Sequence, residues 1–222
     1  MLKLGEKILN LVYPPKCTFC HSLLMDDEYA DGRFICQECR GSISILDRNA
    51  SSQSFENVSE CISAFYYEGY IRDALHRYKF QGRQLYAVLF SEYMFKAFEQ
   101  SGIQADIISW APLSRKRLRS RGYDQAKLLA EEIAQKTGIE CATLLKKTKN
   151  VKPQSQTGAY DERRKNISGA YSPACAEKIK NKRILLIDDI VTTGSTLSEC
   201  AGVLKSAGAD EIYALTVARR KD

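Results

Sequence analysis

Residues 183–196 read Arg-Ile-Leu-Leu-Ile-Asp-Asp-Ile-Val-Thr-Thr-Gly-Ser-Thr, and this stretch decides how the rest of the chain is interpreted. Ile184 to Ile187 form a short continuous apolar run, which is typical of a strand buried on both faces of a parallel sheet. Ligands of open α/β sheets bind just past the carboxyl ends of such strands, where Asp188 and Asp189 fall. Two adjacent acids cannot both enter a core without a large desolvation cost. At least one carboxylate is therefore expected to face solvent or a ligand, such as the vicinal hydroxyls of a sugar.

The five residues that follow have the properties of a phosphate-binding loop. A glycine lets the backbone approach a ligand closely, and successive N–H groups at a helix N-terminus attract an anion. Hydroxyl side chains add further donors. The alternative is an ordinary strand, turn and helix with a Ser or Thr cap, but the combination of acids, hydroxyls and glycine favours a sugar-phosphate site. The predicted phosphate-binding residues are Thr192, Thr193, Gly194, Ser195 and Thr196.

A basic segment follows another expected strand, at 106–110, and should face the same crevice. It holds five basic residues within seven positions: Arg115, Lys116, Arg117, Arg119 and Arg121. Arginine forks suit a pyrophosphate well. A solvated basic turn and a nucleic-acid patch are the alternatives. The chain carries 33 Lys and Arg against 27 Asp and Glu, and its net charge of +6 does not decide between them.

Two Cys-x-x-Cys pairs near the N-terminus have the spacing of a four-cysteine zinc site. The pairs are separated by fifteen residues and consist of Cys17, Cys20, Cys36 and Cys39. Zinc with four thiolate ligands has no open position, so such a site is structural. Two disulfides are the rival interpretation. No secretory signal is visible in residues 1–10, so we expect a cytoplasmic protein, in which structural disulfides are rare.

The alternation of expected strands and helices predicts an α/β fold with a parallel sheet. We expect three segments: an N-terminal segment and zinc module at 1–46, a polar linker at 47–60, and a main domain at 61–222. No apolar run is long enough to span a membrane. Strands are expected at 61–67, 106–110, 139–145, 184–187 and 211–217, and helices at 71–78, 85–98, 124–137 and from 197 to about 208.

The stretch 146–168 is polar, with almost no apolar residues, and lies between two expected strands. A long segment of this kind inside a compact domain is usually functional and often forms a lid. Its candidate functional residues are Gln156, Gly158, Arg163 and Arg164.

The 183–196 stretch resembles the phosphoribosyl pyrophosphate (PRPP) signature of type I phosphoribosyltransferases. The resemblance implies that Asp188 and Asp189 hold the ribose hydroxyls and orient the sugar for catalysis, and that residues 192–196 bind the 5-phosphate. It also implies Mg²⁺ on the pyrophosphate and ribose oxygens, pyrophosphate held by the basic segment, and a flexible hood at 146–168.

Five motifs occur in an order that resembles the ComF family over nearly the whole chain: the cysteine module, the signature, and the segments 79–82, 121–126 and 156–158. That family usually has Asn at the position of Asp124, which we expect to cap its helix. The resemblance implies a part in natural competence, with single-stranded DNA and a helicase-like ATPase as partners.

Three functional hypotheses follow. The first is a Mg-dependent phosphoribosyltransferase with an unidentified acceptor, and the second an adaptor that binds PRPP without transfer. The third is a factor that binds single-stranded DNA through its zinc module and basic loops. Stacking on aromatic rings would support it, with Phe65, Tyr66, Tyr67 and Tyr70 as candidates, although their strand or hairpin positions favour a place in the core.

Overall fold

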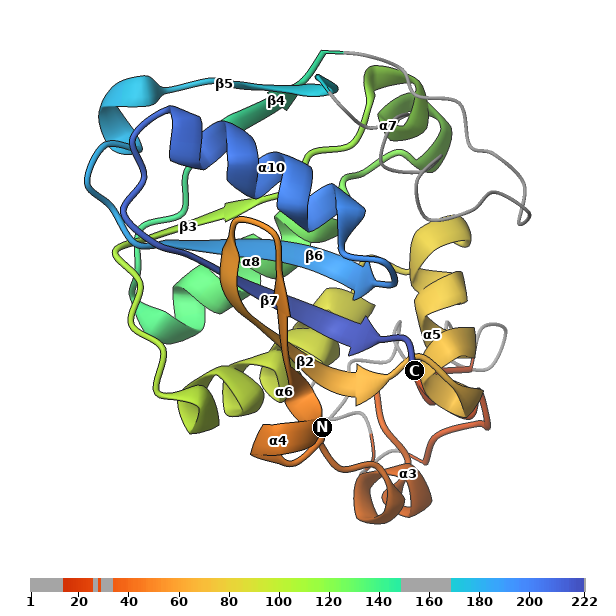
Figure 1. Cartoon of the computed structure of the whole chain (residues 1–222). Coiled ribbons are helices and arrows are strands. Elements are labelled where there is room, and N and C mark those ends of the chain that lie inside the picture. The colour runs from red at the N-terminus through yellow and green to blue at the C-terminus, as the bar shows by residue number, and fades with distance from the viewer. Residues whose placement is uncertain (1–13, 26–27, 29–33, 149–168, 222) are drawn as a thin grey trace.

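A five-stranded sheet in the order β1-β2-β7-β6-β3 forms the centre of the molecule (Figure 1). The computed structural model describes residues 14–25, 28, 34–148 and 169–221. The pairs β2–β7, β7–β6 and β6–β3 are parallel, and β1 pairs antiparallel with β2 at the edge. Its strands are β1 (Ser52–Phe55), β2 (Val58–Tyr66), β3 (Ile107–Trp110), β6 (Ile184–Val191) and β7 (Ile212–Arg219).

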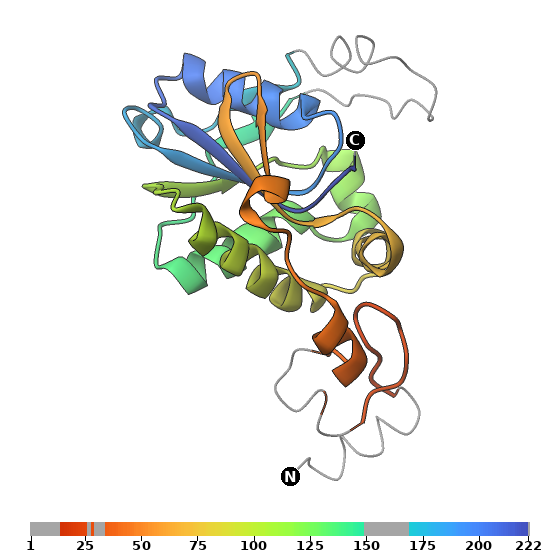
Figure 2. The same cartoon turned by 60° about the horizontal axis from the view of Figure 1, so that its bottom comes forward.

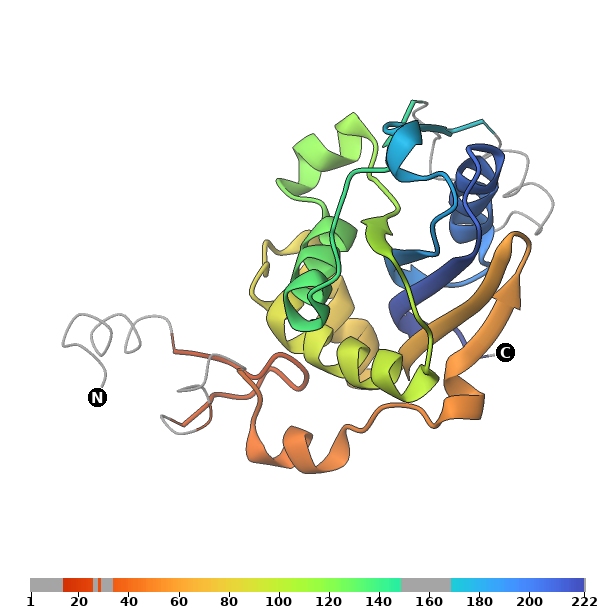
Figure 3. The same ribbon diagram turned by 90° about the vertical axis from the view of Figure 1, so that its left-hand side faces the viewer.

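Helices cover both faces of this sheet, and Figure 3 shows α6 and α8 on one side with α10 on the other. The alternation along β6 explains the arrangement: Leu185 and Ile187 join the core under α6 and α8, whereas Ile184 and Leu186 join the core under α10. A strand covered on both faces has to be apolar throughout. The helices are α3 (Gln37–Ser42), α4 (Arg48–Ser51), α5 (Gly69–Phe80), α6 (Tyr86–Ser101), α7 (Arg115–Arg121), α8 (Gln125–Thr137) and α10 (Ser195–Ser206), with a 3₁₀ turn at Ala176–Lys178.

The expected α/β fold is confirmed, with four local corrections. The signature strand continues to Val191, so Asp188 and Asp189 lie within the strand near its end and not beyond it. Asp188 pairs in register with Thr216 of β7. The neighbouring parallel strand continues the hydrogen-bonding ladder past the apolar run, which is why the polar residues remain extended.

The polar stretch 47–60, which was expected to be a linker, forms secondary structure instead. Asp47 caps α4 by accepting hydrogen bonds from the N–H groups of Asn49 and Ala50, both at 3.0 Å. Strand β1 then completes the sheet as its outer strand. An edge strand faces water along one side, so a polar composition does not prevent it from pairing.

The strand expected at 139–145 is reduced to a single parallel bridge between Ile108 and Cys141. Strand β3 has only four residues, and beyond the bridge the chain leaves the sheet edge. It continues into β4 (Leu145–Lys147), which pairs antiparallel with β5 (Tyr171–Pro173) in a separate two-stranded sheet.

The basic segment, which was not among the expected helices, forms the short helix α7. Its first turn is capped by Ser114, whose Oγ accepts a hydrogen bond from the N–H of Arg117 at 3.4 Å. Gly122 ends it with a φ of 80°. Asp124 caps the next helix as predicted, because its Oδ1 accepts a hydrogen bond from the N–H of Lys127 at 3.3 Å. Among the helices described, none combines the length and the apolar character that crossing a membrane requires.

Candidate functional site

A crevice of about 330 Å³ lies where the carboxyl ends of β6 and β3 meet the neighbouring helices. Its walls come from segments far apart in the sequence, which the parallel sheet brings to one edge. The polar and charged lining residues are Tyr67, Lys79, Arg117, Arg121, Gln125, Lys147, Tyr171, Asp188, Asp189, Thr192 and Thr196.

The two adjacent acids have different surroundings because neighbouring residues of a strand point to opposite faces. Asp189 forms an ion pair with Lys79 of α5, with Nζ and Oδ1 2.9 Å apart. Asp188 instead lies on the side of the buried thiols of Cys61 and Cys200 and accepts a hydrogen bond from the N–H of Asp189 at 2.8 Å.

Burial raises the pKa of Asp188 to about 7, and the negative charge of Asp189 adds to the effect. Ionising a carboxyl group in such surroundings is costly, because burial removes water from the charged form. Near neutral pH the Asp188 carboxyl can therefore either give up or accept a proton, whereas Asp189 has a cationic partner.

Two of the five predicted phosphate-binding residues line the crevice, and the other three do not. Thr192 and Thr196 line the crevice, and the hydroxyls of Thr193 and Ser195 hydrogen-bond to each other at 2.8 Å. Gly194 is the N-cap of α10, with a φ of 71°.

Gly194 is needed for two reasons. Its positive φ favours glycine, and the ring of Phe55 lies so close that a Cβ at this position would overlap the ring. Phe55 belongs to β1, within the stretch expected to be a linker. The edge hairpin therefore packs directly against the loop that precedes α10.

Two of the five basic candidates line the crevice, namely Arg117 and Arg121, which are four residues apart on α7. Arg121 donates a hydrogen bond to Oε1 of Gln125 at 2.9 Å, and burial lowers its pKa. The other three candidates are exposed to solvent and are not among the residues that line the crevice: Arg115, Lys116 and Arg119.

Sequence reasoning missed Lys79, Gln125, Lys147 and Tyr171 as lining residues. Lys147 of β4 donates a hydrogen bond to the hydroxyl of Tyr171 of β5 at 2.7 Å. Burial lowers the pKa of Lys147, and the positive charge of Arg117 lowers it further. Lys79 lies in a segment that contributed to the family resemblance, but its chemical role had no local signal. Gln156, Gly158, Arg163 and Arg164 lie outside the described residues.

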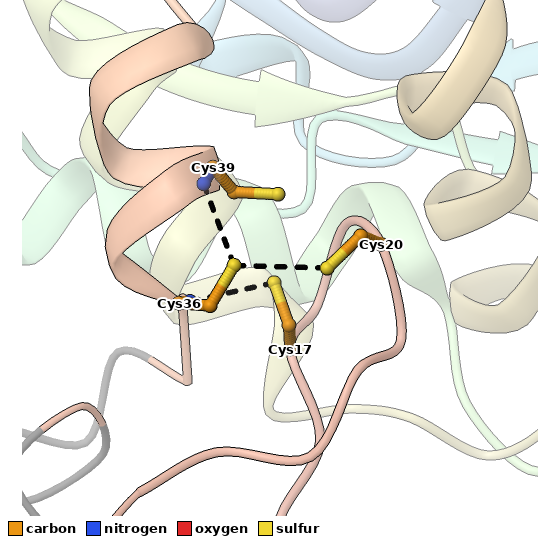
Figure 4. Close-up of side chains that lie close together, drawn as sticks. All are labelled: Cys17, Cys20, Cys36 and Cys39. Atoms are coloured by element: carbon orange, nitrogen blue, oxygen red, sulfur yellow. Dashed lines mark hydrogen bonds between the residues drawn. The ribbon is translucent and has the colours of Figure 1, made fainter.

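The four cysteines form a cluster whose sulfur atoms all lie within 4.8 Å of one another (Figure 4). The N–H groups of Cys36 and Cys39 point to the sulfurs of Cys17 and Cys36, at 3.5 and 3.4 Å. The sulfurs of Cys20 and Cys36 are 3.6 Å apart, well beyond a disulfide bond of about 2.05 Å. The arrangement has the donor set of a tetrahedral thiolate site.

This cysteine module packs against α5 and α6, at the side of the molecule shown at the bottom of Figure 2. Phe19, between the first two cysteines, is 1% exposed and contacts Phe65, Phe90 and Tyr93 edge-on. Arg77 donates hydrogen bonds to the carbonyls of Thr18 and Phe19 at 2.8 and 2.7 Å. Helix α5 therefore contacts the cysteine module through Arg77 and the crevice through Lys79.

Comparison with known protein families identifies a phosphoribosyl transferase domain over residues 120–222. The chain is 36% identical to competence protein F of Haemophilus influenzae over 110 residues, which are 49% of this chain and 48% of that protein. It is 28% identical to competence protein ComFC of Streptococcus pneumoniae over 157 residues, 70% of this chain and 66% of that one. The chain thus spans about half the length of the first relative and 66% of the second.

Among solved structures, the allosteric regulatory enzyme of purine biosynthesis superposes with a TM-score of 0.41 at 20% identity. The superposition covers 63% of this chain and 29% of that enzyme.

Proposed function

Because the chain is similar to competence proteins F and ComFC and matches a phosphoribosyl transferase domain over residues 120–222, we propose that it is a member of the ComF family whose crevice binds PRPP with magnesium and transfers the phosphoribosyl group to an acceptor. The observation that carries the proposal is the meeting of three groups in one cavity: two carboxylates, the hydroxyls of Thr192 and Thr196 at the start of α10, and two arginines of α7. A ribose with a phosphate at each end has the same sequence of hydroxyls and anions.

In this function each part of the crevice contacts one part of PRPP. Asp188 and Asp189 accept hydrogen bonds from the ribose hydroxyls, and Thr192 and Thr196 bind the 5-phosphate with the N-terminus of α10. Arg117 and Arg121 bind the pyrophosphate with their guanidinium groups.

The reaction exchanges one bond at C1 of the ribose. The bond to the pyrophosphate oxygen breaks, pyrophosphate leaves with the electron pair, and the acceptor forms a new bond to C1 and loses its proton. The arginines stabilise the negative charge that develops on the leaving group. Asp188, whose pKa lies near neutrality, is the group suited to take up the proton.

Magnesium fits the chemistry of this crevice because it prefers hard oxygen ligands. The pyrophosphate and ribose oxygens of PRPP would hold it, and Asp188 and Asp189 would hold the ribose. When bound, the ion neutralises charge on the pyrophosphate. The pairing of Asp189 with Lys79 leaves Asp188 as the carboxylate without a cationic side chain at ion-pair distance among the described residues.

Zinc fits the cysteine module, and Cys17, Cys20, Cys36 and Cys39 would hold it. The two N–H groups aimed at sulfur stabilise thiolates, and four sulfur ligands leave no position for a substrate. The proposed role of zinc is structural.

The first test measures the melting temperature with and without magnesium and PRPP. Ligand at about a hundred times its Kd adds roughly 2.7 kcal/mol of stability, which corresponds to a rise of several degrees for a chain of this size. The combined variant Asp188→Asn, Asp189→Asn should lose this rise. An unchanged rise in the variant would contradict the proposed site.

A second test compares the two faces of α7. Replacing Arg117 and Arg121 with Ala should weaken PRPP binding strongly, because both line the crevice, whereas replacing Arg115 and Arg119 should weaken it little. Equal losses would mean that all the basic residues of the segment bind the pyrophosphate. Release of pyrophosphate during incubation then separates an enzyme from an adaptor that only binds PRPP.

A role in handling single-stranded DNA is the second candidate function. It is favoured by the exposed basic residues Arg115, Lys116 and Arg119 and by Tyr70, which is 57% exposed. Phe65 belongs to the core and Tyr67 lines the crevice, so neither is free to stack on a base there. The names of both relatives refer to competence. A helicase-like ATPase is the proposed partner.

This second function predicts that binding of a single-stranded oligonucleotide weakens steeply with salt, because phosphate contacts release counterions. Replacing the three exposed basic residues should reduce that salt dependence. Binding that does not vary with salt would count against it.

A further inference from the structure

A second cavity, of about 450 Å³, adjoins the crevice and is lined by Lys79, Phe80, Arg117, Ser120 and Arg121. Three of these residues, Lys79, Arg117 and Arg121, also line the crevice, so the two cavities share one wall. Phe80 and Ser120 belong to the second cavity and are absent from the crevice lining.

The charge of this lining selects the sign of a ligand. Of the five described residues that line the cavity, three are cationic and none is acidic. Lys79 has its carboxylate partner, Asp189, on the crevice side of the wall. A ligand in the second cavity would therefore meet positive charge, a hydroxyl and an aromatic ring, which together suit an anion with a flat apolar part.

The ring of Phe80 supplies the flat surface. Phe80 is the last residue of α5 and is 58% exposed. The guanidinium carbon of Arg121 lies 4.9 Å from the centre of the ring, and the ring of His76 lies 4.9 Å away at an interplanar angle of 46°. A phenyl ring beside a guanidinium group is a surface on which a nucleobase stacks.

We propose that this second cavity binds a nucleoside monophosphate, with the base on Phe80 and the phosphate on Arg117 and Arg121. Since the arginines also line the crevice, the bound nucleotide competes with the pyrophosphate of PRPP, a consequence that rests on the proposed function. The volume of about 450 Å³ lies within the range of about 300–1,000 Å³ that small-ligand pockets occupy.

The experiment titrates the full chain with AMP by calorimetry, with ribose 5-phosphate as the probe that lacks a base. Phe80→Ala should weaken AMP binding about tenfold, which equals about 1.4 kcal/mol, and should leave ribose 5-phosphate unchanged. Leu85→Ala is the control, because Leu85 is 66% exposed and is not among the residues that line either cavity. Both side chains are largely exposed, so neither change should unfold the protein.

A nucleotide could instead enter the crevice itself, and the combined variant Asp188→Asn, Asp189→Asn separates the two sites. Retained AMP binding in this variant supports the second cavity. AMP binding that is lost there but unaffected by Phe80→Ala overturns the proposal. A single-stranded oligonucleotide that binds more tightly than AMP, with the same loss in Phe80→Ala, overturns it in favour of nucleic acid.

Failure of the proposed function has a different signature. If PRPP with magnesium leaves the melting temperature of the unaltered chain unchanged while AMP binds through Phe80, the transferase proposal falls and the nucleotide site stands. If PRPP binds and AMP does not, only the nucleotide site falls.

Discussion

The cysteine module and the crevice are built in opposite ways. The four cysteines lie within residues 17–39, their sulfurs lie within 4.8 Å of one another, and the neighbouring Phe19 is buried in the main core. The crevice collects side chains from residue 67 to residue 196 and keeps an acid, Asp188, in a buried setting that raises its pKa. The first region is arranged for stability. The crevice retains a carboxyl group, Asp188, whose ionised form is unfavourable in the folded chain and which a ligand can use. Functional sites commonly reduce stability in this way.

The largest effect is expected from breaking the cysteine module at a ligand. Cys36→Ser should abolish zinc binding and lower the melting temperature more than loss of the Phe19 ring or a substitution in the crevice, because structural zinc contributes about 10–16 kcal/mol in zinc-finger peptides at pH 7. Cys175→Ser is the control, since Cys175 lies outside the cluster. Metal analysis and thermal denaturation measure both. Equal zinc content in the two variants would contradict the four-cysteine site.

A smaller loss is expected where the module meets the main core. Phe19→Ala removes a buried ring that contacts three aromatic side chains, and should cost about 3–5 kcal/mol. Zinc should stay bound, because no ligand changes. Denaturant unfolding gives the free energy of unfolding. A loss below about 1 kcal/mol would indicate that the module is an independent attachment.

A substitution at the loop before α10 should impair PRPP binding in the crevice while lowering the stability of the fold only slightly. Gly194→Ala has to fit a methyl group against Phe55 at a φ of 71°, and should lose the melting-temperature rise with PRPP and cost about 1–3 kcal/mol. Gly138→Ala is a matched control, with a φ of 72° and nothing within 4 Å of an added Cβ. It should cost only about 1 kcal/mol and keep the rise with PRPP. Similar results for both variants would show that Phe55 simply moves aside.

The last expected effect has the opposite sign. The pKa of Asp188 is about 7 in the folded chain against about 3.9 when unfolded. The folded state therefore binds the proton more tightly, and its stability falls as the pH rises from about 4 to about 7. Asp188→Asn should melt a few degrees higher than the unaltered chain at pH 8, and the difference should shrink towards pH 4.

The same variant should lose the melting-temperature rise with PRPP, so that stability and binding change in opposite directions. Melting curves at several pH values provide the measurement. A variant that is less stable at pH 8 would show that Asp188 makes a stabilising contact in the folded chain.

Sequence reasoning was most successful where neighbouring residues act together. The apolar run before Asp188, the hydroxyl loop and the paired cysteines each carry their chemistry within a few positions. It failed at the two edges of the sheet. The polar stretch 47–60 contributes an edge strand, although its composition suggested a linker. At the other edge, a single bridge replaces the strand expected at 139–145. An edge position relaxes the usual link between burial and strand formation.

The sequence by itself determined the parallel α/β fold, the four clustered cysteines and the segment that contributes Asp188 and Asp189 to the crevice. Only the tertiary structure decided that Lys79 pairs with Asp189, that Arg117 and Arg121 turn towards the crevice, and that Phe80 remains exposed beside them. The physical reason is the range of the interactions. Hydrophobic periodicity and ligand spacing act over a few residues, whereas an ion pair between α5 and β6 exists only after the sheet has brought distant segments together.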